Sequence, residues 1–174
     1  MANMSMADPG YWRLPDGFFS SNEDEISALG LRMSLHLLGP DEPSTGVWLV
    51  CQFEPGYIIS RHCHPAFRFE IICRGTLEAE GRVFEAGDVM TADPDELYGP
   101  KVAGPDGCLT LEVFSSRDGA QVTWLELKDG SLRRGSPGRD ELGEVYDWYL
   151  ARSAEIRGDR DFWARRERGG YTGG

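Results

Sequence analysis

Short runs of β-type residues recur along most of this chain, and turn-forming residues separate them. The clearest runs are LRMSLHLL (31–38), TGVWLVCQFE (45–54), FRFEIIC (67–73), LTLEVFS (109–115) and QVTWLEL (121–127). Segments such as EPG, AGD and GPDG, rich in glycine, proline and aspartate, lie between the runs. Many short strands with this punctuation are typical of an antiparallel sandwich or barrel. We therefore expect an all-β fold, in which Thr110, Glu112 and Phe114 share one face of their strand.

Length and charge exclude several classes of protein. A chain of 174 residues is long enough for one domain with a real core. Its net charge of −11 opposes binding to phosphate backbones, so we expect no nucleic-acid partner. It has no apolar run near the length of a membrane span, and its first residues lack the pattern of a secretory signal. We expect a cytoplasmic protein with no membrane contact, whose four cysteines are reduced.

Three regions can be distinguished. Residues 1–10 are predicted to be a disordered leader, and residues 11–127 to form the β domain. The remainder, 128–174, is predicted to hold a linker, a helix and a tail, because ELGEVYDWYLARSAEIR has the spacing of an amphipathic helix. The aromatic stripe of that helix would pack against the β domain or a second subunit. We expect a homodimer.

Two of the three histidines lie one residue apart, at His62 and His64. Successive side chains of a strand alternate between its faces, so these two imidazoles project to the same side. By the same parity Arg68 and Glu70 face that side too. Paired imidazoles on a rigid backbone form a chelating geometry for a metal. The alternative is a pair of histidines at a strand end that are solvated and have no function.

The residues around this pair resemble the cupin family. Gly56, His62, His64, Arg68 and Gly75 keep the spacing of the first cupin motif, G-x5-H-x-H-x3,4-E-x6-G. Further on, FEAGDVMTADPDELYGP resembles the second motif. The resemblance covers about residues 45 to 115 and implies a cupin double-stranded β-helix, a jelly-roll-like barrel, here with a C-terminal α-helical extension. The branch it resembles contains dioxygenases and the cupin domains of zinc anti-sigma factors.

The chain departs from the cupin pattern at two metal ligands. Arg68 stands where the family has a glutamate, and Tyr98 stands where it has a third histidine. Glu70 and His36 are the candidate replacements, so the predicted metal ligands are His62, His64, Glu70 and His36. The resemblance implies one divalent metal ion, with iron first and manganese, nickel or zinc next.

These residues lead to three hypotheses about function. The first is a metal-dependent enzyme, a dioxygenase before an isomerase or lyase, that acts on a small oxygenated organic acid or ketone. In it Arg68 would orient the anionic end of the substrate, and Tyr98 would donate a proton or a hydrogen bond. The second is a non-catalytic cupin that senses zinc or a small molecule. The third is a metal-free cupin that binds an anionic ligand through Arg68 and Tyr98.

Overall fold

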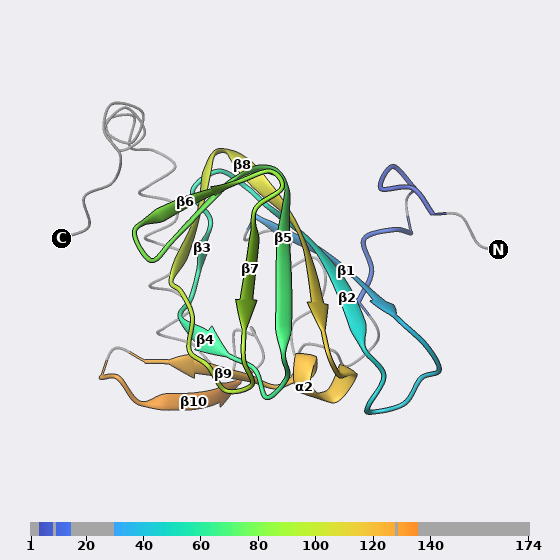
Figure 1. Cartoon of the computed structure of the whole chain (residues 1–174). Helices are drawn as coiled ribbons and strands as arrows, with labels where there is room; N and C mark the ends of the chain where they lie inside the picture. The colour runs from blue at the N-terminus through green and yellow to red at the C-terminus, as the bar shows by residue number, and fades with distance from the viewer. Residues whose placement is uncertain (1–3, 9, 15–29, 128, 136–174) are drawn as a thin grey trace.

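The computed structural model describes residues 4–8, 10–14, 30–127 and 129–135. The elements are β1 (Leu31–Leu37), β2 (Val47–Phe53), β3 (Ile58–Ile59), β4 (His62–Cys63), β5 (Arg68–Ala79), β6 (Arg82–Glu85), β7 (Val89–Ala92), β8 (Lys101–Phe114), α2 (Arg117–Gln121), β9 (Thr123–Glu126) and β10 (Leu132–Gly135). Strands dominate the described residues, and the prediction of an all-β fold is confirmed (Figure 1). The predicted C-terminal helix lies outside these residues.

The strands form two antiparallel sheets. The larger sheet has the order β1-β2-β8-β5-β6, with β3 also paired to β8 and β7 also paired to β5. The smaller sheet has the order β10-β9-β4 and lies across the lower end of the larger one in the view of Figure 1. The two long strands β5 and β8 pair along most of their length and connect the two halves of the large sheet.

The outer parts of the chain differ from the sequence prediction. The chain continues past Leu127 as a hairpin, in which β10 pairs with β9, whereas a linker was predicted there. Of the predicted leader 1–10, residues 4–8 and 10 are described, and there the amide of Asp8 donates to the carbonyl oxygen of Ser5. In the described part of the chain, no helix has the length and apolarity needed to cross a bilayer.

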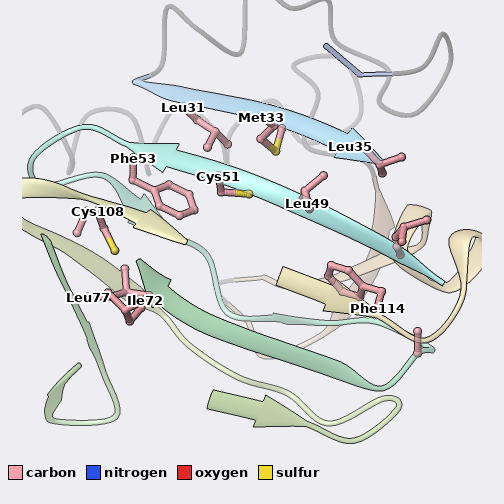
Figure 2. Close-up of a cluster of buried hydrophobic side chains, with 14 residues drawn as sticks. Leu31, Met33, Leu35, Leu49, Cys51, Phe53, Ile72, Leu77, Cys108 and Phe114 are labelled. Carbon is pink, nitrogen blue, oxygen red and sulfur yellow. The ribbon is translucent and has the colours of Figure 1, made fainter. Parts of the chain in front are cut away.

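The large sheet has a fully buried inner face and a half-exposed outer face. The predicted alternation in β8 is confirmed: Thr110, Glu112 and Phe114 are buried, while Leu111 and Val113 are only partly so. An apolar core lies on the inner face, and its side chains point toward one another in Figure 2. Its members include Leu31, Met33, Leu35, Leu49, Cys51, Phe53, Ile72, Leu77, Cys108 and Phe114.

Two glycines let β5 and β8 approach each other at a bulge. Gly75 has a φ of 74°, and a Cβ built on it would lie 2.0 Å from the carbonyl oxygen of Gly107. Any side chain at this position would push the strands apart. The register between the strands shifts on both sides of Gly75. This bulge separates the half of β5 that carries Arg68 and Glu70 from the half that carries Leu77.

Candidate functional site

Residues from β4, β5, β8 and the turn before β8 meet at one end of the inner face. His62 of β4 and Tyr98 exchange two backbone hydrogen bonds of 3.0 Å, which fixes the Tyr98 turn against β4. On β5, Arg68 and Glu70 point inward, with 2% and 0% of their surfaces exposed. The structure therefore brings His62, His64, Arg68, Glu70 and Tyr98 together; strand parity had grouped the first four, and Tyr98 was singled out by its place in the second motif.

The two imidazoles are adjacent and held by the backbone. Their ring centroids lie 5.2 Å apart, with the rings almost perpendicular. The Nδ1 of His62 donates to the carbonyl oxygen of Ser60 at 2.6 Å, and that of His64 to the carbonyl oxygen of Val122 at 2.9 Å. A hydrogen bond at Nδ1 fixes the orientation of the ring and leaves Nε2 for another partner.

A buried cluster of four charges fills the space beside the imidazoles. Arg68 donates through Nε to a Glu112 oxygen at 2.7 Å and through Nη2 to Glu70. Lys101 donates through Nζ to the same Glu70 oxygen at 2.6 Å. The cluster holds two cations and two carboxylates, so its charges balance. Burial of such groups is tolerated only with this kind of pairing.

The ring of Tyr98 lies at the centre of these groups. The guanidinium carbon of Arg68 is 4.4 Å from the ring centroid, and the ammonium nitrogen of Lys101 is 4.6 Å from it. Both distances are those of cation–π contacts. The centroid of His62 lies 4.5 Å away. The hydroxyl of Tyr98 and the Oε1 of Glu70 are buried polar atoms with no hydrogen-bond partner among the described residues.

The pKa shifts follow from burial and from these charges. Burial lowers the pKa of His62 well below its ordinary value, and His64, Lys101 and Arg68 lower it further. Burial also lowers the pKa of His64 to about 4, against an opposing effect of Glu112. Burial raises the pKa of Tyr98, so its hydroxyl stays protonated. Both imidazoles are neutral near neutral pH.

His36 does not reach this cluster, which corrects the prediction that it is a metal ligand. Glu70 pairs with Glu112, which pairs with Leu49, so these three lie in one row across the inner face. His36 pairs with Trp48 in the adjacent row and therefore projects from the opposite face of the sheet. There its ring stacks on Trp48 at 4.3 Å.

The donor set does not fit the divalent metal that the cupin resemblance implies. His62 and His64 are oriented as metal ligands are. The Oε2 atom of Glu70, however, is bound by Arg68 and Lys101, and the hydroxyl of Tyr98 keeps its proton. Among the described residues there is no group of three or more His, Cys, Asp or Glu side chains that could hold a metal ion.

Sequence analysis missed two members of the cluster, Lys101 and Glu112. The alternation in β8 placed Glu112 on the same face as Thr110 and Phe114. If that face is buried, the carboxylate needs a buried partner, and this could have identified Glu112 as a candidate site residue. Lys101 follows a turn, and no periodic pattern assigns it to either face. In the β5–β8 ladder Lys101 pairs with Ala79, so only the tertiary fold brings its Nζ to Glu70.

No family model and no curated protein matches this chain. Several of the solved structures similar to it are named as cupins. An RmlC-like cupin from Shewanella frigidimarina is 20% identical, covers 49% of this chain and 75% of its own, and has a TM-score of 0.40. A candidate acetylacetone dioxygenase from Methylibium petroleiphilum is 14% identical, with 67% and 78% covered and a TM-score of 0.46. In the Rhodobacter sphaeroides complex of SigE with the anti-sigma ChrR, the matching chain is 21% identical. The match covers 49% of this chain and 45% of that chain, with a TM-score of 0.41.

The name of the first structure is that of the family which the histidine motif resembles. At these identities and TM-scores the likeness carries no argument about the chemistry of this chain. The chemistry of the site is therefore argued from this chain's own side chains.

Proposed function

We propose that this protein binds a small oxygenated organic molecule at the cluster around His62, His64 and Tyr98, without a resident metal ion. One observation carries the proposal. The carboxylate of Glu70, the nearest replacement for the missing metal ligand, is already bound to Arg68 and Lys101. Two imidazoles and a phenol remain beside it to interact with a ligand.

The unpaired polar atoms support a ligand at this place. A buried hydroxyl with no partner costs stability, and such atoms are few in native proteins. Tyr98 has one, and the centroid of the ring that carries it lies 4.5 Å from that of His62 and 6.4 Å from that of His64. Its pKa is raised by burial, so it can donate a hydrogen bond to a ligand oxygen across the whole ordinary pH range.

The experiment is metal analysis together with ligand screening on the full chain. We expect less than stoichiometric metal after purification, and none retained after incubation with zinc, manganous or anaerobic ferrous ions. Small diols, hydroxyketones and hydroxyacids are then screened by the shift of the melting temperature. Binding that Tyr98→Phe weakens and His36→Gln leaves intact supports the proposal. Stoichiometric metal that disappears in His62→Ala/His64→Ala overturns it.

The second candidate is the metal-dependent enzyme expected from the cupin resemblance, a dioxygenase before an isomerase or lyase. The observation that favours it is the pair of Nδ1 hydrogen bonds to Ser60 and Val122, which orients both Nε2 atoms as in metal-binding histidines. Metal retention in the experiment above, followed by oxygen uptake with diketones, would select this candidate. The homodimer stays a prediction, to be tested by light scattering.

A further inference from the structure

The acceptor atoms of the site indicate which ligand it takes. Resting on the proposed function, we infer that His62 and His64 accept hydrogen bonds from a neutral ligand with two hydroxyl groups, and that Arg68 is not the binding group for a ligand carboxylate. This differs from the expectation that Arg68 and Tyr98 hold an anion.

The first step is the tautomer of the two rings. A carbonyl oxygen can only accept a hydrogen bond, so the Nδ1 atoms facing Ser60 and Val122 both carry a proton. In a neutral imidazole the other nitrogen then has a lone pair and no proton. Each Nε2 is therefore an acceptor.

The second step is the position of the two cations. Arg68 and Lys101 both lie against the ring of Tyr98, whose centroid is 4.5 Å from that of His62. An imidazole is mostly neutral near pH 7, and these cations oppose a further positive charge beside them. Two adjacent neutral acceptors require O–H or N–H donors, or a cation, from whatever binds between them.

The third step is the charge balance of the cluster. Arg68 already donates to Glu112 and Glu70, and Lys101 also donates to Glu70. Two cations face two carboxylates, so a ligand carboxylate would add an uncompensated negative charge to a buried site. A ligand cation would add the opposite excess beside Arg68 and Lys101. A neutral ligand leaves the balance unchanged.

The hydroxyl of Tyr98 completes the pattern. It has no partner, and its ring centroid lies 4.5 Å from that of His62 and 6.4 Å from that of His64. A protonated phenol donates to an acceptor oxygen. The matching ligand offers two hydroxyl donors to the imidazoles and one carbonyl or ether oxygen to Tyr98, as a dihydroxyketone does.

The first experiment reads the tautomers directly. Long-range proton–nitrogen correlation spectra of the 15N-labelled full chain distinguish protonated from bare ring nitrogens, and His36→Gln assigns the signal on the outer face. We expect His62 and His64 to carry a proton on Nδ1 and none on Nε2 at about pH 7. A proton on the Nε2 of either ring overturns the inference before any ligand is added.

The second experiment compares three ketone probes in the same spectra. Dihydroxyacetone has two hydroxyl donors, 1,3-dimethoxyacetone has none, and hydroxypyruvate carries a carboxylate. We expect dihydroxyacetone alone to move the Nε2 signals of His62 and His64, with His36 unchanged. In Tyr98→Phe the same response should need at least about five-fold more probe, the loss of one neutral hydrogen bond.

The outcomes separate the inference from the proposed function. A response to hydroxypyruvate without one to dihydroxyacetone overturns the inference and leaves ligand binding at this site supported. An equal response to 1,3-dimethoxyacetone overturns the donor requirement. If none of the three probes moves either imidazole, both the inference and the proposed function are overturned.

Discussion

The two halves of β5 are equally buried, yet they are stabilised in different ways. Arg68 and Glu70 are exposed by 2% and 0%, and Leu77, beyond the bulge, by 0%. The apolar half gains stability from area removed from water, residue by residue. The ionic half depends on mutual pairing, so that each charge needs its partner. The two ends of β5 therefore differ in role. One end is part of the apolar core, and the other carries the charged residues of the candidate site.

The largest difference between the two halves is expected when one charge is removed from the ionic half. We expect Arg68→Met to lower the free energy of unfolding by about 3–5 kcal/mol, because it leaves the carboxylates of Glu70 and Glu112 buried with one cation fewer. Urea denaturation at about pH 7 measures this. The control is Arg61→Met, since the Arg61–Glu126 pair is partly exposed and is worth under about 1 kcal/mol. Equal losses in the two variants would mean that the cluster is not coupled.

A large-to-small substitution in the apolar half sharpens the contrast. Leu77→Ala should cost about 3 kcal/mol, since it removes a fully buried side chain and leaves a cavity. The cost should be the same at about pH 7 and pH 5, because no titrating group changes its partner. A cost that varies with pH would show that the two halves are not energetically separate.

The ionic end should also confer the pH dependence of stability. His64 has its folded pKa lowered from 6.5 to about 4, so the unfolded chain binds a proton first as the pH falls. The contribution of neutral His64 to the free energy of unfolding is complete above about pH 6.5 and is lost progressively toward pH 4. The loss is about 2 kcal/mol between pH 7 and pH 5. His64→Gln should remove that part of the slope in urea titrations. A slope identical to that of the original protein would contradict the lowered pKa.

The smallest effect is expected at the unpaired hydroxyl. Tyr98→Phe removes a buried polar atom with no partner and keeps the ring against Arg68 and Lys101. We expect the free energy of unfolding to rise by about 1 kcal/mol. A loss of similar size in urea denaturation would show that the hydroxyl already has a hydrogen-bond partner in the protein.

Much of the site was accessible from the sequence because strand parity is a local rule. His62 and His64 were placed together, and Arg68 and Glu70 on the same face, from a period of two residues alone. In the structure Glu70, which was expected to bind a metal, is the partner of Arg68. His36 was misplaced because parity fixes only which residues of a strand share a face. Which face turns inward depends on the neighbouring strand.

The sequence by itself determined the all-β fold, the strand periods and the pairing of the two histidines, because these depend on neighbours along the chain. Only the tertiary structure decided which face of each strand is buried. In β8 the face with Leu109, Leu111 and Val113 is the more exposed one, and the face with Thr110 and Glu112 is buried. The physical reason is that Arg68 of β5 and Lys101, 11 residues before Glu112 on β8, give that carboxylate and Glu70 their partners. A buried charge is acceptable only where the fold brings its counter-charge to it.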